Sequence, residues 1–261
     1  MAGKNEGTQN LSPGLETLWG DAGDVLRKRR AGLTREDIVT TAIELADRSG
    51  LAAISMASIA KELGFSTMAI YRHIPSKAEL LLLMEDAGIG APPEAVFEPT
   101  GWRARLERMA QEIAAVYRRR SWLLAIPITG APATPNNIRW LEAGLAALKE
   151  TSLEAEDRFA VYFLIVSFIQ GNLRFFAEIE RANQEDVAEG DNGEEPYGIL
   201  LTRLMPPGMF PEVEEMIAVG ILDQDDSAEE EFDFALQRVL DGIEVFVDAK
   251  SQRQRTAKGS L

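Results

Sequence analysis

Residues 55–77, SMASIAKELGFSTMAIYRHIPSK, constrain the fold of this chain more than any other segment. Ser55 is a good N-cap for a first helix, whose apolar face would comprise Ile59, Ala60 and Leu63. Gly64 stops this helix, because glycine accepts the left-handed backbone of a tight turn at little cost. Pro75 blocks the extension of a second helix. The segment therefore predicts two short helices joined by a tight turn.

The second helix would span only about two turns and would close with Tyr71, Arg72 and His73. A helix this short contributes little to a hydrophobic core, but it is well suited to lying in the major groove of DNA. We expect Phe65 to anchor the turn and Ser66 or Thr67 to cap the second helix. The spacing alone also allows an αα-hairpin inside an ordinary helical core.

Residues 33–88 resemble the DNA-binding domain of the tetracycline-repressor (TetR) family. The matching positions are Ile59-Ala60, Leu63-Gly64-Phe65, Ile70-Tyr71, His73-Ile74 and Lys77 to Leu81. A fainter resemblance to the tetracycline-repressor type of C-terminal domain lies in residues 136–142 and in the segments PEVEEMIAVG and FDFALQRVLDGIE. The resemblance implies an all-α fold. An N-terminal three-helix helix-turn-helix domain would precede a C-terminal helical domain for ligand binding and dimerisation.

The distribution of charge favours a nucleic-acid ligand, although the net charge of the chain is −15. Residues 27–77 carry nine Lys or Arg and five Asp or Glu, a net charge of +4, and the remainder carries −19. A basic end on an acidic body is typical of a protein that docks on DNA in one orientation. The acidic body would repel phosphates at any other face.

Composition argues against several kinds of site and location. The 261 residues include no Cys and a single His, so we expect no disulfide, no thiolate chemistry, no metal site and no cofactor. The N-terminus lacks the apolar core of a signal peptide. The longest apolar run, residues 159–169, is too short to span a bilayer and is expected to form a buried helix. We therefore expect a cytoplasmic protein without membrane contact, which the resemblance makes bacterial.

The first ninety residues divide into an arm and a domain. Residues 1–30 are Gly-rich and weakly patterned, and they are predicted to form a flexible arm with a basic end at residues 27–30. This end could contact phosphates or the minor groove, or it could be a solvated basic run. Residues 31–90 would form the helix-turn-helix domain. Its first helix would begin at the N-cap Thr34, and its last would begin near Ser76.

Residues 91–255 would form the helical effector-binding and dimerisation domain. Its predicted helices cover residues 101–120, 121–128, 136–149, 154–182, 197–204, 211–219 and a segment from 228. Residues 183–195 are strongly acidic and are expected to be disordered. No segment shows the alternation of apolar and polar residues that is typical of a strand, so the body should be helical throughout.

The predicted DNA contacts are Thr34, Ser55, Ser66, Thr67, Met68, Ala69, Tyr71, Arg72, His73 and Lys77. The resemblance implies that residues 66–69 read base edges while Tyr71, His73 and Lys77 hold phosphates. Arg72 could pair with guanine or with a phosphate. Tyr71 could instead be a packed aromatic side chain. Thr34 and Ser55 would place backbone N–H groups of their helices near phosphates.

Aromatic and polar side chains lie together in the predicted body helices. The candidate effector-binding residues are Trp102, Trp122, Asn137, Trp140, Phe163, Phe168, Gln170 and Arg174. An apolar cavity with a few polar groups is the usual form of a small-molecule site, whereas the same aromatics are also common in a plain core. The resemblance implies a small-molecule effector, largely apolar, that lowers DNA affinity. The body lacks the well-placed histidine and the metal-binding partners that a tetracycline–magnesium effector would need.

The helices predicted at 154–182 and 228–250 carry wide apolar stripes that suit a four-helix dimer interface. The predicted interface residues are Phe232, Leu236, Val239, Ile243 and Phe246. A short recognition helix binds weakly alone, so two-fold pairing over a palindrome is expected. Burial within one subunit would produce the same stripes.

These features together predict a homodimeric transcriptional repressor that a small molecule releases from a palindromic, double-stranded DNA operator. An enzyme is not expected, because the carboxylates of the body concentrate in polar runs such as residues 229–231. The alternative is a helical ligand carrier or scaffold whose helix-turn-helix does not read DNA.

Overall fold

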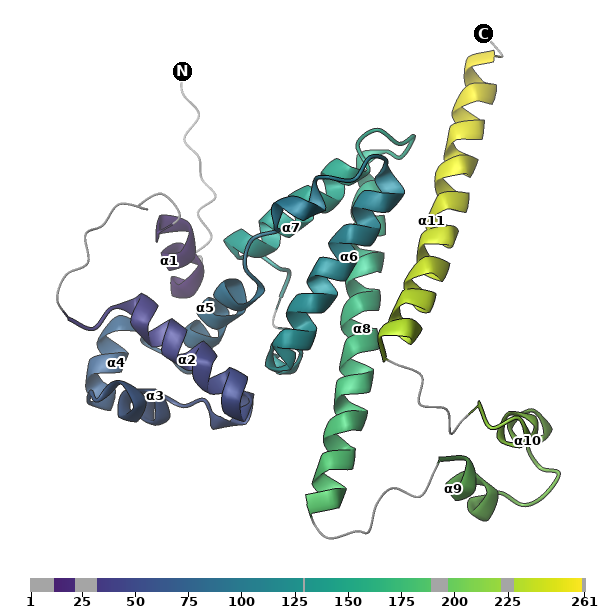
Figure 1. Ribbon diagram of the computed structural model, residues 1–261. Coiled ribbons are helices and arrows are strands. Elements are labelled where there is room, and N and C mark those ends of the chain that lie inside the picture. Colours follow the sequence, from purple (N-terminus) through teal and green to yellow (C-terminus); the bar gives the residue numbers. More distant parts are fainter. Residues whose placement is uncertain (1–11, 22–31, 129, 189–196, 222–227, 260–261) are drawn as a thin grey trace. The chain divides into compact units, whose positions relative to one another are not determined.

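The computed structural model describes residues 12–21, 32–128, 130–188, 197–221 and 228–259, and every regular element in these ranges is a helix (Figure 1). The predicted all-α fold is thus confirmed. Two compact units make up the chain, Met1–Leu173 with Gly242–Leu261, and Arg174–Asp241. The domain boundary expected at residue 90 falls inside the first unit, because the helix before it packs on helices from both sides of that boundary.

The helix-turn-helix domain comprises α2 (Arg35–Ser49), α3 (Met56–Leu63), α4 (Thr67–His73) and α5 (Lys77–Ile89). Ser66 caps α4 by accepting the N–H of Ala69, and Ser76 caps α5 by accepting the N–H of Glu79. Gly64 has φ 73° and ψ 25°, the left-handed conformation that the sequence predicted for this turn. Local capping chemistry therefore fixes the boundaries of these short helices.

Isoleucines form the core beneath α4. Ile38 of α2, Ile59 of α3 and Ile70 of α4 are fully buried. The expected anchoring role of Phe65 is wrong, since its side chain is 47% exposed. The turn is closed instead by the backbone, where the N–H of Phe65 donates to the carbonyl of Ala60 at 2.9 Å.

The N-terminal segment expected as a flexible arm contains a helix, α1 (Pro13–Asp21), which packs against α5. Its Gly14 is buried, and this close approach gives a weakly patterned segment a tertiary partner. The basic residues 27–30 and the rest of the expected arm lie outside the described residues.

The body of the first unit contains α6 (Trp102–Arg119), the 3₁₀ helix η3 (Ser121–Ala125), α7 (Pro135–Ala147) and parts of two long helices. These are α8 (Ala155–Ala188) and α11 (Ala228–Gly259). The short apolar helix expected at 121–128 is thus a 3₁₀ helix that ends at Ala125. Gly144 of α7 allows Tyr162 of α8 to pack closely, because a Cβ at Gly144 would lie 2.5 Å from the Tyr162 ring and 3.2 Å from Met109 Sδ.

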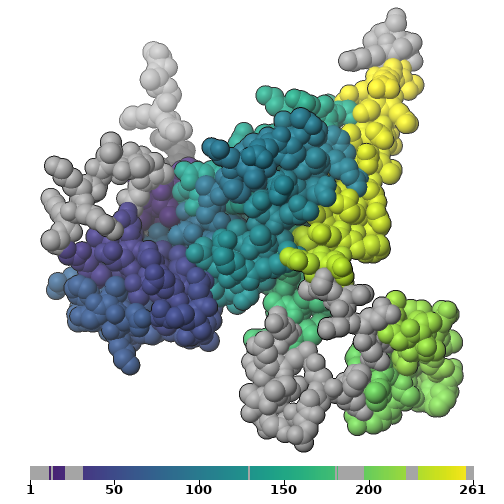
Figure 2. Space-filling model, viewed as in Figure 1, coloured from purple at the N-terminus to yellow at the C-terminus, as the bar shows by residue number. Residues whose placement is uncertain are grey.

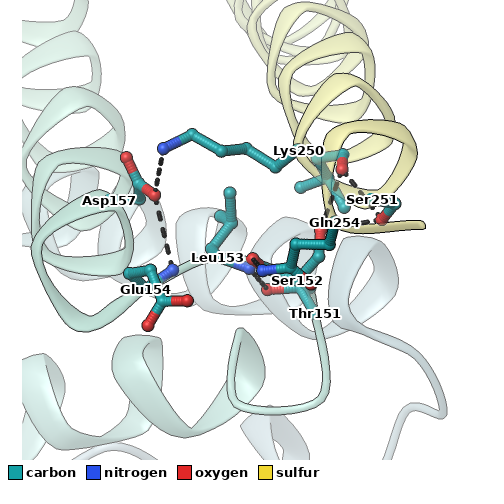
Figure 3. Close-up of polar contacts among 9 residues, drawn as sticks. Thr151, Ser152, Leu153, Glu154, Asp157, Lys250, Ser251 and Gln254 are labelled. Carbon is teal, nitrogen blue, oxygen red and sulfur yellow. Dashed lines mark hydrogen bonds and ion pairs between the residues drawn. The ribbon is translucent and has the colours of Figure 1, made fainter. Parts of the chain in front are cut away.

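A polar clamp joins the start of α8 to the C-terminal half of α11 (Figure 3). Lys250 Nζ lies 2.6 Å from Asp157 Oδ2, and Ser251 donates to Ser152 Oγ at 2.7 Å. Gln254 Nε2 donates to the carbonyl of Ser152 at 3.0 Å. Hydrogen bonding to Lys250 lowers the pKa of the Asp157 carboxyl. The clamp fixes which faces these two helices leave open to solvent.

Part of the long apolar stretch is not buried as expected. Phe159 and Leu164 are 49% and 51% exposed, whereas Ile165 and Ile169 are fully buried. By length and composition alone, Ala155–Ile179 of α8 could cross a membrane. One side of α8 therefore belongs to the core of the first unit, and the other side is an uncovered apolar surface.

The second unit contains the end of α8, α9 (Tyr197–Leu204), α10 (Pro211–Ala218) and the start of α11. The short helices expected at 197–204 and 211–219 are present, and α9 packs against α10. α8 remains helical to Ala188, so the expectation of disorder is wrong for residues 183–188, which continue the helix. Residues 189–195 lie outside the described residues.

Gly144→Ala should lower the free energy of unfolding by about 1–3 kcal/mol, because the added methyl overpacks a closed contact with Tyr162. Urea unfolding measures this change at fixed protein concentration. Gly20→Ala is the matched control, since a Cβ at that helical position meets nothing within 4 Å. Equal unfolding midpoints for the two variants would contradict the packing described here.

Candidate nucleic-acid interface

α4 presents most of the predicted base- and phosphate-contacting side chains to solvent. Met68 is 67% exposed and Tyr71 is 44% exposed, and Arg72 and Lys77 are also exposed. Positions 68, 71 and 72 share one side of this helix, opposite the buried Ile70. Residues 56–73 form part of the outer surface of the molecule (Figure 2). α4 is therefore uncovered along the face that would meet a groove.

Three of the remaining predicted contacts on α4 are less exposed. Thr67, Ala69 and His73 are half-buried, while Ser66 is exposed and accepts the N–H of Ala69 at 3.3 Å. Small side chains at the start of α4 leave room for base edges to approach the backbone. The exposed fraction of Tyr71 is greater than a packed aromatic side chain would have, which favours its polar role over the packing alternative.

Thr34 and Ser55 are both engaged in capping boxes. Thr34 Oγ1 accepts the N–H of Asp37 at 3.1 Å, and Ser55 Oγ accepts the N–H of Ser58 at 3.0 Å. These hydroxyls satisfy helix N–H groups, so any anion would meet the backbone N–H groups that begin α2 and α3. Their contact with phosphate stays a prediction.

Arg35 connects the start of α2 to the end of the candidate recognition helix. Its Nε donates to the carbonyl of His73 at 3.4 Å. A cation at the C-terminus of α4 suits the negative end of the helix dipole. No local pattern in the sequence indicates this contact, because it joins residues 38 positions apart.

The last turn of α5 is bound to the start of α7 through a buried carboxylate. Asp86 is 7% exposed and accepts the backbone N–H of Asn136 at 2.7 Å. The Asn136 side chain donates to Asp86 Oδ2 at 3.1 Å and to the Asp86 carbonyl at 2.9 Å. The N-terminus of α7 thus takes the place of the water that would otherwise solvate this carboxylate. Its backbone N–H groups and its dipole both favour an anion.

Two further contacts reinforce the link between α5 and α7. Trp140 is 1% exposed and donates its indole N–H to the carbonyl of Gly90 at 2.9 Å. Asn137 Nδ2 donates to Glu85 Oε1 at 3.1 Å and to Thr134 Oγ1 at 2.9 Å. Burial raises the pKa of the Glu85 carboxyl, although the hydrogen bond from Asn137 opposes the shift.

η3 binds both α2 and α5. The Trp122 indole N–H donates to Asp47 Oδ1 of α2 at 2.5 Å, and Arg120 donates to the carbonyl of Gly88 in α5 at 2.8 Å. A Cβ at Gly88 would lie 2.9 Å from the Trp122 ring, so glycine permits this approach. We call the contacts that hold α2 and α5 to η3 and α7 the junction.

Three predicted effector-binding residues, Trp122, Asn137 and Trp140, therefore have their polar atoms engaged at the junction. Elsewhere in the body, Trp102, Phe163 and Phe168 are half-buried, and Gln170 Nε2 donates to the Tyr117 hydroxyl at 2.8 Å. Burial, with Tyr117 nearby, raises the pKa of the Tyr162 hydroxyl. Arg174 begins the second unit. The structure thus places three of the eight candidates at the junction, four elsewhere in the first unit and one in the second unit.

The residues predicted for dimerisation are mostly turned inward. Phe232, Leu236 and Ile243 are at most 2% exposed, so they cannot form a surface that meets a partner. Val239 is half-buried, whereas Phe246 is 38% exposed. The prediction was wrong for the three buried residues because α11 is apolar on more than one face. Among the described residues, no group of three or more His, Cys, Asp or Glu side chains could hold a metal ion.

Comparison with known protein families accounts for this arrangement. A model described as "Bacterial regulatory proteins, tetR family" matches residues 38–84, and "Tetracyclin repressor-like, C-terminal domain" matches residues 97–247. The chain belongs to the TetR family. These regulators bind DNA through the helix-turn-helix that α3 and α4 form here, so the resemblance noted in the sequence is confirmed.

Two relatives of this chain are transcriptional regulators, and the first spans nearly all of it. The HTH-type transcriptional repressor DrrR1 of Streptomyces coeruleorubidus is 32% identical over 255 residues, covering 94% of this chain and 91% of its own. An HTH-type transcriptional regulator of Saccharopolyspora erythraea is 28% identical over 141 residues, covering 54% of this chain and 60% of its own. The similarity to regulators of this kind thus extends from the helix-turn-helix through the body.

Solved structures agree with the fold. The Streptomyces coelicolor TetR family protein ActR, in complex with actinorhodin, superimposes with a TM-score of 0.64 at 23% sequence identity. The match covers 84% of this chain and 98% of that chain. At this identity the similarity supports the helical architecture of the TetR family.

Glu85→Gln should make the protein more stable at neutral pH but not near pH 4.5, the ordinary pKa of the group. The folded state binds the Glu85 proton more tightly than the unfolded state, so the wild-type protein loses stability as pH rises through the raised pKa. Gln cannot ionise and keeps an oxygen for Asn137. Urea unfolding from pH 4 to pH 8 measures the difference.

Glu142→Gln, at an exposed position of α7, is the control for this series. A stability difference between Glu85→Gln and wild type that is the same at pH 4 and pH 7 would rule out this linkage.

Proposed function

We propose that this TetR-family protein is a homodimeric repressor that binds a palindromic operator and is released by a small-molecule effector. One observation carries the DNA-binding part. α4 exposes Met68, Tyr71 and Arg72 on one side, next to Lys77, in a region of net charge +4 on a chain of net charge −15. Residues 66–69 would read base edges, and Tyr71, His73 and Lys77 would contact phosphates. Such a protein acts on chromosomal DNA in the cytoplasm.

The uncovered surface of α8 and α11 supports the dimer. Ala160, Leu164, Ser167 and Gly171 are exposed on one stripe of α8, and Gly242, Val245 and Ala249 are exposed on one stripe of α11. Residues at these spacings share a helix face, and their small side chains allow another helix to approach closely. Pairing this surface with its symmetry mate would form a four-helix interface and bury Leu164 and Val245.

This dimer accounts for the apolar side of α8 better than a membrane would. Asp157, in the first turn of the same helix, is paired with Lys250, and the exposed stripe combines Leu164 with small and polar residues. Ionised side chains such as these are costly inside a bilayer, whereas they are well tolerated between helices in water. We therefore assign the exposed stripe to a second copy of the chain.

An effector would release the protein from DNA by acting through the junction. α5 carries Lys77 at its N-terminal end and Asp86 at its C-terminal end, so a shift of α7 that moves Asp86 also moves the phosphate contact. Two recognition helices must lie about 34 Å apart to reach successive major grooves. An effector that binds one arrangement of the body more tightly would change this separation and lower DNA affinity. ActR was solved with actinorhodin, which supports a small-molecule effector here.

DNase I footprinting on the DNA beside its own gene tests the proposed function. We expect a protected palindrome whose two half-sites are centred about 10 base pairs or a multiple apart, with protection that weakens at high salt. The absence of any sequence-specific footprint, with and without cellular extract, would exclude the repressor and favour the ligand carrier.

Lys77→Ala and Arg72→Ala should each weaken operator binding at least tenfold while the body stays folded. Loss of the Lys77 phosphate contact should also reduce the slope of log K against log salt by about 1. Fluorescence anisotropy at several salt concentrations measures both effects. Arg119→Ala, which removes an exposed charge from α6, is the matched control. If all three variants bind alike, α4 and the start of α5 do not read DNA.

Leu164→Glu should weaken dimerisation at least thirtyfold, because it buries a charge at the centre of the proposed interface. Analytical ultracentrifugation measures the dimer dissociation constant. Ile128→Asp adds a charge at an equally apolar, 73% exposed position outside α8 and α11 and should leave the constant unchanged. A Leu164→Glu protein that remains dimeric at nanomolar concentration would rule out this face.

A further inference from the structure

α1 has no place in the function proposed so far. It covers Pro13–Asp21, outside residues 38–84 and 97–247 that the TetR-family models match. It nevertheless packs on α5, the helix that joins the DNA contacts to the body. The position of α1 is therefore a property of this chain that the family assignment does not explain.

The first anchor of α1 is a close contact with α5. Gly14 is buried, and a Cβ at this position would lie 2.8 Å from Leu82 Cδ2 and 3.2 Å from Glu79 Cγ. The missing side chain allows the α1 backbone to lie against the middle of α5. Glu79 is 8% exposed beneath it. A side chain at position 14 would have to displace Leu82 and Glu79, and a long charged one cannot be accommodated without moving α1 from α5.

The second anchor reaches the body. The Trp19 indole N–H donates to the carbonyl of Ala133 at 3.0 Å. Ala133 directly precedes Thr134, the N-cap residue of α7, whose side chain accepts a hydrogen bond from Asn137. α1 thus bridges α5 and the start of α7, the same two elements that Asp86 joins.

Docking and helix formation are coupled in α1. A helix of nine residues is marginal in water, because nucleation costs more than two turns recover. α1 is therefore helical because both anchors hold it. Both anchors can form only when α5 and the loop at Ala133 keep their present spacing. Docked α1 therefore stabilises this position of α5 relative to the loop over other positions.

We propose that α1 is an intramolecular strap that stabilises this position of α5 on the body and thereby sets operator affinity. This regulatory role rests on the proposed function, because it acts through the movement of α5. A movement of α5 relative to α7 must release one anchor, and α1 then loses its helical structure. The strap thus raises the free-energy cost of that movement, whether or not an effector is bound.

Gly14→Glu tests the first anchor, with Gly20→Glu as the matched control on the same helix. The Gly14 variant adds bulk and charge beside Glu79, whereas a Cβ at Gly20 meets nothing within 4 Å. Hydrogen–deuterium exchange of the full-length proteins measures docking. We expect amides of residues 17–21 to lose at least tenfold protection in Gly14→Glu, with faster exchange in α5. Gly20→Glu should exchange as wild type does.

Operator affinity then tests the regulatory role on the footprinted DNA. Gly14→Glu should change the operator dissociation constant at least threefold. Trp19→Phe, which removes only the indole N–H, should change it in the same direction by a smaller factor. Gly20→Glu should stay within 1.5-fold, since it adds the same charge without displacing α1.

Wild-type protection of α1 in Gly14→Glu, or unchanged affinity despite lost protection, would overturn the strap. Changes of opposite sign in Gly14→Glu and Trp19→Phe would overturn it as well. If the wild type and Gly20→Glu both fail to bind specific DNA, the proposed function fails instead. The exchange of α1 and α5 still reports on docking in that case.

Discussion

The structure of the first unit depends on the carboxylate of Asp86. Removing an ionised carboxylate from water is costly unless hydrogen bonds and compensating charge replace the solvent. Here the replacement is the start of α7, where the backbone N–H and the side chain of Asn136 both donate to it. The charge is tolerable only while the end of α5 and the start of α7 meet. Asp86 therefore ties the helix-turn-helix to the body more strictly than apolar packing could.

Directional contacts around Asp86 make the junction a candidate two-state element. The indole of Trp140 and the guanidinium of Arg120 both donate to carbonyls at the end of α5, and Trp122 donates to Asp47 of α2. Apolar packing tolerates small sliding, whereas hydrogen bonds at such distances are either made or broken. A body that changes shape must therefore exchange one set of bonds for another.

Much of the helix-turn-helix was predictable because local chemistry specifies it. Thr34, Ser55, Ser66 and Ser76 cap their helices, and Gly64 closes the turn, so short-range signals set each boundary. α1 was not predictable, since a weakly patterned segment becomes helical only through a tertiary contact at Gly14. The junction was equally hidden, because no local pattern pairs residues as distant as Asp47 and Trp122. The dimer residues on α11 were misplaced because periodicity gives the spacing of apolar positions without saying which stripe faces inward.

The distribution of tryptophan has an optical consequence. Of the four tryptophans in the chain, Trp19, Trp122 and Trp140 each donate an indole N–H across the boundary between the helix-turn-helix domain or α1 and the body. The fluorescence of an indole responds to the polarity and hydrogen bonding around it. The protein therefore carries intrinsic emission probes at the junction, and rearrangement there can be followed in unlabelled protein.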